Sequence, residues 1–548
     1  MAKRKDRRTF IKQSALALGG LALAGSYVPA CAPPEKKALA GQLFGPSHKA
    51  GHLLRTGITI TPKFTEKVAV VIVGGGVAGL SAARWIKKET NLACCLLELE
   101  DQTGGNSLSG KNDVSAYPWG AHYLPLPNNT NKDLLTFLEE EKVVTGYNAE
   151  GLPFYNEYHL NFDPEERLFI NGYWQEGLVP TFGVPNADQK QIERFLHLME
   201  EMKVAKGSDG RFAFDIPLEY SSADKTFREL DNLSFQEWLT SQNLNSNYLR
   251  WYADYCCLDD FGATAAQTSA WAGIHYFAAR KAQAANSDGH RVLTWPQGNH
   301  WLTERLKNQA GADLRTGSLV YHLEIMDGKV VVEYLNLQTK QPTRLIADTC
   351  IIATPHFVRN RLLAKVLDAT VPTKVSEFSY APWLVANVTL NQVPPGKGAP
   401  LSWDNVIYGS ASLGYVYANH QSVEGFPEKQ VITYYQPLPD ASPAARQEAY
   451  RKTHTDWAEQ AIAELEKAHP GIRAVIERVD VWVWGHGMIK PTPGFLWGQE
   501  RALAGEPIQG KISFAHSDLS GISIFEEAFY QGIKAAKQLL KQNGNETA

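Results

Sequence analysis

The stretch Lys67-Val-Ala-Val-Val-Ile-Val73-Gly74-Gly75-Gly76-Val77-Ala78-Gly79-Leu80 decides the fold of this chain. Its first part is a continuous run of mostly β-branched residues, which is typical of a parallel strand buried on both faces. Three glycines end the run, and residues 77–88 then have helical periodicity. A second apolar run over residues 91–97 completes a strand–helix–strand unit, which predicts a parallel sheet.

Gly74, Gly76 and Gly79 have the spacing of a dinucleotide-binding turn. The first glycine allows the tight bend, the second lets the backbone approach a pyrophosphate, and the third allows close packing of helix on strand. The helix N-terminus adds N–H groups and positive potential. Glu98 lies 22 positions after Gly76, where an acid accepts from a ribose hydroxyl. The sequence therefore predicts a dinucleotide site, with a phosphate-free Rossmann unit as the alternative.

The rest of the chain alternates between helical and strand-rich regions. Residues 128–283 are expected to be mostly helical, with an amphipathic helix over 188–203 and a capping box that starts at Ser234. Strand patterns return over 319–353, with a hairpin turn at Asp327-Gly328. Further strands are expected at 384–390, 430–435, 479–484 and 512–515, and helices at 446–469 and 526–542.

The composition is that of a globular protein with an acidic body. A length of 548 residues suggests two or more domains, and 44% apolar with 20% charged residues excludes wholesale disorder. No apolar run approaches the ~18 residues that a membrane span needs. Without residues 1–30, 48 basic residues face 57 acidic ones. Such a body repels phosphate backbones, so we expect a small-molecule substrate and no nucleic acid as partner.

The N-terminus is expected to be an export signal. Arg7-Arg8-Thr-Phe-Ile-Lys12 precedes a mildly apolar stretch over 15–24, and this pattern resembles a twin-arginine signal. A chance basic tail is the alternative. Twin-arginine export carries folded proteins, often with their cofactor. The pattern therefore predicts a periplasmic protein that engages the twin-arginine machinery.

Cys31 follows Val28-Pro29-Ala30 in what resembles a lipoprotein processing site. Lipid on Cys31 would hold the protein at the membrane, whereas ordinary cleavage near Ala30 would release it. Residues 32–62 are interpreted as a tether. The remaining cysteines have no metal-ligand spacing, so we predict neither a metal site nor a disulfide framework. They are Cys94, Cys95, Cys256, Cys257 and Cys350.

Gly104 and Gly105, which follow Glu98, begin a resemblance to a known family. The pair resembles part of the FAD-binding opening of the flavin-containing amine oxidase superfamily, whose relatives include phytoene desaturases and protoporphyrinogen oxidases. Four later segments resemble further flavin segments of that family in the same order. They are residues 119–122, 295–298, 347–355 and 514–532. The resemblance runs from about residue 64 to residue 540 and implies an FAD-dependent oxidoreductase.

The resemblance also implies a fold and a set of cofactor residues. The fold is α/β, with a Rossmann-type FAD-binding domain and an interleaved α+β substrate domain that combines a mixed sheet with a helical insert. The signal would cover 1–31, the tether 32–62, the FAD domain 64–127, 284–355 and 506–546, and the substrate domain 128–283 and 356–505. The implied cofactor-binding residues are Gly74, Gly76, Val77, Ala78, Gly79, Glu98, Gly104, Gly105, Asn106, Gly120, Ala121, Val320, Ser517, Asp518, Phe525 and Ala528.

Three departures from the family pattern concern the active site. His516 replaces a glycine in the closing segment, and the following acid position falls on Ser517, one place before Asp518. Val385 or a neighbour stands where many amine oxidases carry a lysine near flavin N5. The two aromatics that sandwich an amine correspond to Gly487 and Ile524, so that cage is expected to be absent.

His486, Trp484 and Asp260 are the candidates for catalysis. The family register places His486 near the flavin ring, where an imidazole can relay a proton, orient substrate or attach to the flavin. A core histidine bonded to backbone is the alternative. Asp260 and its neighbour Asp259 could hold a substrate cation, or merely end a helix.

These features leave three functions open. The first is oxidation of an amine, polyamines included, by hydride transfer to flavin N5 with O2 as acceptor. The acidic body favours it, while the missing lysine and cage oppose it. The second is a dehydrogenase or desaturase of a larger apolar or cyclic molecule with a quinone-like acceptor. The third is a non-catalytic flavin-bearing lipoprotein.

Overall fold

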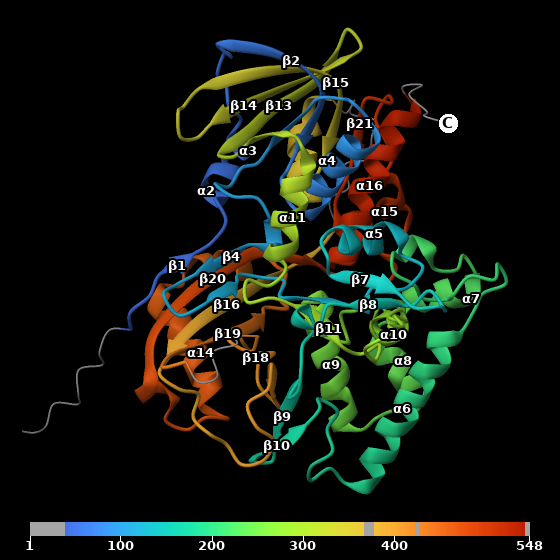
Figure 1. Cartoon of the computed structure of the whole chain (residues 1–548), viewed down its shortest axis with the longest axis vertical. Coiled ribbons are helices and arrows are strands. Elements are labelled where there is room, and N and C mark those ends of the chain that lie inside the picture. Colours follow the sequence, from blue (N-terminus) through green and yellow to red (C-terminus); the bar gives the residue numbers. More distant parts are fainter. Residues whose placement is uncertain (1–38, 367–377, 422–426, 543–548) are drawn as a thin grey trace, which may run out of the picture. The chain divides into compact units, whose positions relative to one another are not determined.

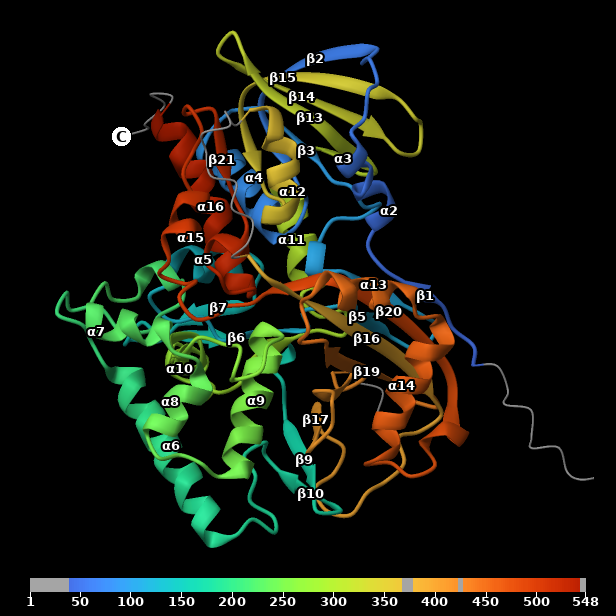
Figure 2. The same cartoon turned by 180° about the vertical axis from the view of Figure 1, so that it is seen from behind.

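The computed structural model describes residues 39–366, 378–421 and 427–542. From Ala40 onward the chain forms one compact unit, which is organised around two large sheets (Figures 1 and 2). The twin arginines and Cys31 lie outside the described residues, so export and lipidation stay predictions. No helix within the described part of the chain is long and apolar enough to cross a membrane.

The seven-stranded sheet contains the predicted strand–helix–strand unit. This unit consists of β2 (Phe64–Val73), α4 (Val77–Glu89) and β3 (Cys94–Leu97), and its two strands pair in parallel. Val70 to Val73 and all of β3 are buried, as the continuous apolar runs predict. The other strands are β12 (Asp313–Arg315), β13 (Ser318–Met326), β14 (Lys329–Asn336), β15 (Pro342–Ile352) and β21 (Ile512–Phe514). The predicted Rossmann-type α/β fold is confirmed.

The sheet is completed by segments from distant parts of the sequence. β15 pairs in parallel with both β2 and β21, although residues 353–511 separate β15 from β21. α16 (Phe525–Gln542) follows β21 and packs on α4. The helix α11 (His300–Ala310) packs on α4 as well. Two helix N-termini, those of α4 and α16, are thereby brought to the same end of the sheet (Figure 1).

The second large sheet has eight strands and contains both parallel and antiparallel pairs. Its order is β1-β20-β16-β19-β18-β17-β9-β10. The strands are β1 (Leu43–Phe44), β9 (Glu166–Ile170), β10 (Tyr173–Glu176), β16 (Tyr380–Leu390), β17 (Asp404–Ile407), β18 (Gly414–Tyr417), β19 (Gln430–Pro437) and β20 (Ile476–Ile489). Every residue of β16 is buried, so both faces of this strand are covered, and antiparallel strands pair with both of its edges.

The helical insert is less uniformly helical than the sequence pattern suggests. α5 (Lys132–Glu140) precedes it, and α6 (Asn186–Val204), α8 (Phe235–Ser241), α9 (Asn247–Phe261) and α10 (Ala270–Ala278) build it (Figure 2). Residues 128–283 also supply strands β9 and β10 and the hairpin of β7 (Val144–Tyr147) and β8 (Pro153–Tyr155). These strands are short and depend on tertiary pairing, so helical periodicity does not reveal them.

Three further expectations concerned the ends of helices and a hairpin turn. The capping box at Ser234 and Glu237 is confirmed, as is the hairpin turn at Asp327-Gly328. The single helix expected over 446–469 is wrong. It is divided into α13 (Pro443–Arg451) and α14 (His454–Glu466), because Thr453 and Asp456 form a capping box that starts a new helix.

The segment expected to be a tether is structured from Ala40 onward. β1 pairs with β20, and the chain then forms two short helices, α2 (His48–Gly51) and α3 (Leu53–Thr56), before it enters β2. The tether interpretation of residues 32–62 is therefore wrong for residues 40–56.

A candidate active site made of a cleft and an acidic cavity

A cleft of about 850 Å³ is lined by residues of both sheets. This volume lies within the ~300–1,000 Å³ of typical cofactor and small-molecule sites. Thirteen of the sixteen expected cofactor residues line it. They are Gly74, Gly76, Val77, Ala78, Glu98, Gly104, Gly105, Asn106, Ala121, Val320, Ser517, Phe525 and Ala528.

The glycine turns form one wall of the cleft, and two of the glycines have no room for a side chain. A Cβ at Gly79 would lie 1.9 Å from the Gly74 carbonyl oxygen, so only glycine lets α4 pack on the turn. Gly74 has φ 109°, and a Cβ there would lie 2.5 Å from the Ala353 carbonyl oxygen. The Gly104 N–H donates to the Gly75 carbonyl at 2.9 Å, which holds the second turn against the first.

Glu98 stands at the end of β3 with its carboxylate fixed by backbone. Oε2 accepts from the Gly75 N–H at 2.6 Å, and Oε1 accepts from the Glu100 N–H at 2.8 Å. Burial raises the pKa of Glu98 to about 7, although these N–H groups oppose the rise. The Thr354 hydroxyl, in a residue that also lines the cleft, is buried without a partner. A dinucleotide fits this set, since its ribose hydroxyls and phosphates would pair with such groups.

Three expected cofactor residues do not line the cleft. Gly79 lies beneath the first turn, and Gly120 borders the neighbouring cavity instead. Asp518 was expected to bind the cofactor, but it does not line the cleft, because its carboxylate is bonded to other residues of the protein. It accepts from the His356 N–H at 2.9 Å and from the Tyr380 hydroxyl at 2.5 Å, and lies 3.0 Å from His516 Nδ1. His516 lines the cleft in its place.

A second, smaller cavity of about 150 Å³ adjoins the cleft. Six residues border both spaces: Asn106, Ala121, Trp484, Ser523, Ile524 and Phe525. A cofactor group that reached this boundary would face the second cavity. The arrangement therefore separates a place for a cofactor from a place for a substrate.

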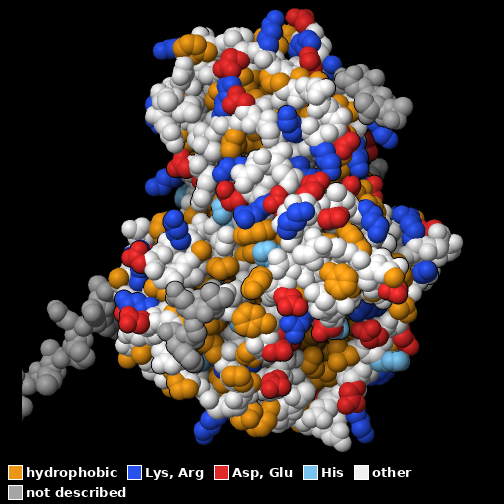
Figure 3. Space-filling model, viewed as in Figure 1, with side chains coloured by type: hydrophobic (Ala, Val, Ile, Leu, Met, Phe, Trp, Pro, Cys, Tyr) orange, Lys and Arg blue, Asp and Glu red, His pale blue; other side chains and the backbone are white. Residues whose placement is uncertain are grey.

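The second cavity is acidic. Asp259 and Asp260 at the end of α9, Asp404 at the start of β17 and Glu526 in α16 line it, with Arg280 as the accompanying strong base. Arg280 Nη2 lies 3.3–3.4 Å from both carboxylate oxygens of Asp260. On the outer face in Figure 3, by contrast, acidic and basic side chains are interspersed. Among the described residues that line it, the cavity therefore holds four carboxyl groups and one guanidinium.

Asp259 and Asp404 form no ion pair within the part of the chain that the structure describes, although the charge of Arg280 opposes the rise in the pKa of Asp259. Asp259 accepts from the Tyr123 hydroxyl at 3.3 Å, and Asp404 accepts from the Tyr255 hydroxyl at 3.5 Å. Burial, with Asp260 adding to it, raises the pKa of Asp259 to about 7, and burial raises the pKa of Asp404 well above its ordinary value. A cation entering the cavity would stabilise the ionised forms of both.

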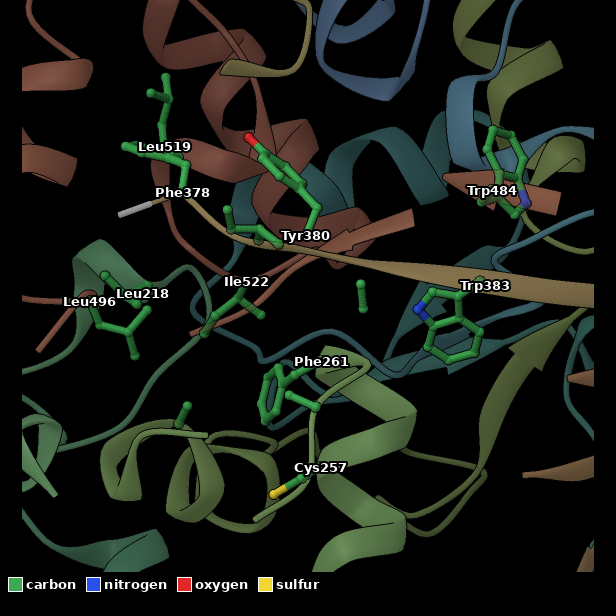
Figure 4. Close-up of a cluster of buried hydrophobic side chains, with 14 of the residues drawn as sticks. Leu218, Cys257, Phe261, Phe378, Tyr380, Trp383, Trp484, Leu496, Leu519 and Ile522 are labelled. Carbon is green, nitrogen blue, oxygen red and sulfur yellow. The ribbon is translucent and has the colours of Figure 1, made fainter. Parts of the chain in front are cut away.

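Aromatic side chains form the other walls of this cavity. Trp383 and Trp484 are paired across β16 and β20 (Figure 4), and Tyr435 is stacked on His122 with ring centres 4.6 Å apart. A Cβ at Gly487 would lie 2.7 Å from Trp383 Cδ1, so the indole occupies the space that a side chain at 487 would need. Gly487 and Ile524, the positions of the family's aromatic pair, border the cavity without supplying a ring, and its aromatic walls come from other positions.

The three catalytic candidates lie in different surroundings. Trp484 borders both spaces, and its indole N–H donates to the Trp119 carbonyl at 2.7 Å. Asp260 is held by Arg280, which leaves Asp259 as the carboxylate available to a ligand. His486 lines the cleft but not the acidic cavity.

The surroundings of His486 keep its imidazole neutral. Its ring stacks on Phe357 with centres 4.2 Å apart. Burial lowers the pKa of His486 to about 4, and Arg446 and Arg55 add to the effect. The neutral ring can accept a hydrogen bond at the cleft wall, but a pKa this low makes it a weak proton acceptor at neutral pH, which favours an orienting or packing role over proton relay.

Sequence reasoning missed Asp404, Glu526, Trp383 and Tyr435. Glu526 and Trp383 lie inside segments that carry the family resemblance, but no spacing marks them as cavity residues. Asp404 and Tyr435 belong to strands with no motif. The order of strands in the eight-stranded sheet brings Trp383, Asp404 and Tyr435 to one cavity, and the start of α16 adds Glu526.

Residues 72–140 match the family of NAD(P)-binding Rossmann-like domains. Among curated proteins, the flavin-containing amine oxidase of Oncorhynchus mykiss is 27% identical over 321 residues, which cover 54% of each chain. The chain thus spans about half the length of this relative.

Solved structures share the fold over a larger part of the chain. Wild-type putrescine oxidase bound to putrescine aligns with a TM-score of 0.63 and 17% identity, over 87% of this chain and 100% of the other. Cyclohexylamine oxidase from Brevibacterium oxydans IH-35A aligns with a TM-score of 0.62 and 14% identity, again over 87% and 100%. Together with the sequence relatives, these structures confirm the predicted resemblance to the flavin-containing amine oxidase superfamily and its α/β fold.

Proposed function

We propose that this chain is an FAD-dependent oxidoreductase that oxidises a small cationic amine, diamines and polyamine-like amines included, with O2 as acceptor. One observation carries the proposal: an acidic, aromatic-walled cavity opens onto a cleft lined by dinucleotide-binding turns. The similarity to flavin-containing amine oxidases supports the same conclusion.

The residues of the cleft suit FAD. The turns at Gly74–Gly76 and Gly104–Gly105 together with the start of α4 would hold the diphosphate, and Glu98 would accept from the adenosine ribose. Trp484, Ile524 and Phe525 would border the ring end, where the cavity begins. The chemistry that FAD would supply when bound there is acceptance of a hydride from the carbon beside the amine nitrogen, followed by reoxidation by O2.

Asp259 would bind and deprotonate the substrate. An ammonium group is attracted to this unpaired carboxylate, and the aromatic walls favour a cation further. Because only the free amine has a lone pair to assist hydride loss, the proton must leave first. A carboxyl with its pKa raised to about 7 is suited to accept it. Asp404 would hold a second ammonium group in a diamine.

Size favours this function over the dehydrogenase or desaturase alternative. A cavity of about 150 Å³ with an excess of carboxylates suits a short charged molecule better than a large apolar one. The alternative of a non-catalytic flavoprotein gives no reason for unpaired buried carboxylates beside the cofactor cleft.

Peroxide release tests the proposal. Purified protein is mixed in air with putrescine, butylamine or 1-butanol, with and without a soluble quinone, and hydrogen peroxide is measured. We expect peroxide from the amines and none from the alcohol. Turnover that required the quinone would support the dehydrogenase alternative, and no turnover with any amine would refute the proposal.

We further propose export by the twin-arginine route to the periplasm, with Cys31 as a lipid anchor. Arg7, Arg8 and the residues around Cys31 support this proposal from sequence alone. Replacing both arginines by lysine should leave the flavoprotein in the cytoplasm, and Cys31→Ala should release it from membranes. Unchanged distribution in cell fractions would refute each claim in turn.

A further inference from the structure

Residues 46–56, which we call the strap, cross the cofactor cleft. Just before the strap, residues 40–45 run along the edge of the eight-stranded sheet. Leu43 and Phe44 pair in parallel with Val481 and Trp482, and the Gln42 N–H donates to Asp480 Oδ1 at 3.0 Å. This end of the segment is therefore fixed to β20.

The strap is then attached to the dinucleotide domain at Glu100. The Ser47 N–H donates to Glu100 Oε1 and the Ser47 hydroxyl donates to Oε2, each at 2.8 Å. His48 stacks on Tyr450 of α13 with ring centres 4.4 Å apart. Since the strap contacts both halves of the molecule, it bridges the cleft between them.

The strap forms part of the cleft wall and brings basic groups to it. Its lining residues are Pro46, Ser47, His48, Gly51, His52, Leu54 and Arg55. Arg55 lowers the pKa of His52, of Arg446 and of His486, after burial in each case. The guanidinium groups of Arg55, from the strap, and Arg446, from α13, thus carry the positive charge near this part of the cleft, and they disfavour protonation of His486.

The two carboxylates that line the cleft, Glu98 and Glu100, are held by other partners, namely backbone N–H groups and Ser47. Arg55 and Arg361, the two arginines that line the cleft, form no ion pair among the residues that the structure describes, and the glycine turns carry no basic side chain. Repulsion among cations at an open cleft is relieved by an anionic ligand. FAD, through its diphosphate, is such an anion.

We propose that the strap is part of the FAD site, where Arg55 balances the diphosphate charge, His52 lines the site beside it, and the Ser47–Glu100 contact keeps the strap closed. The proposal rests on the proposed FAD cofactor. The position fits, because the strap spans from Leu99, beside Glu98, to Tyr450, which lies against Gly485 at the ring end. An FAD that reached from Glu98 to the ring end would therefore lie alongside the strap.

FAD titration of flavin-free protein from riboflavin-starved cells tests the proposal. We expect Arg55→Gln and Ser47→Ala to raise the Kd for FAD about fivefold to tenfold, and Arg55→Lys to restore most of the affinity. Lys49→Gln is the matched control. It removes one positive charge from α2 at an exposed position outside the cleft, so its Kd should equal that of the parent.

Limited trypsin digestion gives a second readout. Trypsin cuts after Lys49 and Arg55, and bound FAD should slow both cuts several-fold in the parent. Equal Kd values for parent, Arg55→Gln and Ser47→Ala, or cleavage at the same rate with and without FAD, would overturn the role of the strap. A parent that bound no FAD would instead refute the cofactor assignment itself, and the strap proposal with it.

Discussion

Asp259 and Asp260 are adjacent in sequence but have different partners. Arg280 forms an ion pair with Asp260, while Asp259 accepts a hydrogen bond from the Tyr123 hydroxyl. The sequence predicted that this pair could bind a cation, and it favoured Asp260 for catalysis. It could not show which carboxylate is neutralised, because Arg280 lies 20 residues further along the chain.

The raised pKa of Asp259 makes the stability of an Asp259→Asn variant depend on pH in a defined direction. The folded pKa is about 7, above the ~4 of an unfolded chain, so the folded protein keeps a proton that the unfolded chain releases. Between about pH 4 and pH 7 the parent therefore loses stability relative to the variant as pH rises. Urea unfolding of both proteins across this range measures the difference, and a pH-independent difference would contradict the raised pKa.

His486→Ala tests whether this residue handles a proton. If the neutral imidazole does so, flavin reduction should slow ~10²-fold while flavin content stays normal. His420→Ala is a matched control, because burial also lowers the pKa of His420 to about 4, and that ring stacks on Phe162 rather than lining the cleft. Reduction within twofold of the parent, together with a lower melting temperature, would show that His486 only packs.

At the scale of elements, signals contained within a few residues were the reliable ones. The β2–α4–β3 unit, the Ser234 capping box and the Asp327-Gly328 hairpin all depend on near neighbours in sequence, and the structure contains each. The helix expected over 446–469 failed at Thr453, where a second capping box outweighed helical periodicity. Strand β1 could not be predicted, since a two-residue strand exists only through its pairing with β20.

The contact between α4 and its glycine turn gives the prediction at this scale. Gly79→Ala would place a Cβ 1.9 Å from the Gly74 carbonyl oxygen, which forces the turn and the helix apart. We expect a loss of ~1–3 kcal/mol in unfolding free energy, together with weaker flavin retention. Gly146→Ala is the control, because a Cβ there meets nothing within 4 Å. Chemical unfolding and bound flavin per protein are the measurements, and a Gly79→Ala protein like the control would contradict this packing.

At the scale of the whole molecule, the active site depends on topology. Its acids come from α9, β17 and α16, and its aromatic walls from β16, β19 and β20. Each of these segments is unremarkable by itself. The family resemblance predicted the cofactor half of the site, because that half follows motifs. In the substrate half, Asp259, Asp260 and Trp484 were candidates from sequence, but Asp404, Trp383 and Tyr435 were not, since only the folded sheet brings them to the cavity.

Anaerobic reduction of the flavin by putrescine, followed by stopped-flow absorbance, tests the central claim most directly. We predict complete bleaching of the parent, and a rate at least tenfold lower for Asp259→Asn at subsaturating amine, because the unpaired carboxylate that binds and deprotonates the substrate is gone. Asp254→Asn, on the same helix but outside the cavity, should match the parent. A flavin that stays oxidised with putrescine and with every other amine tried, or an Asp259→Asn protein reduced as fast as the parent, would contradict the assignment of the acidic cavity as an amine site.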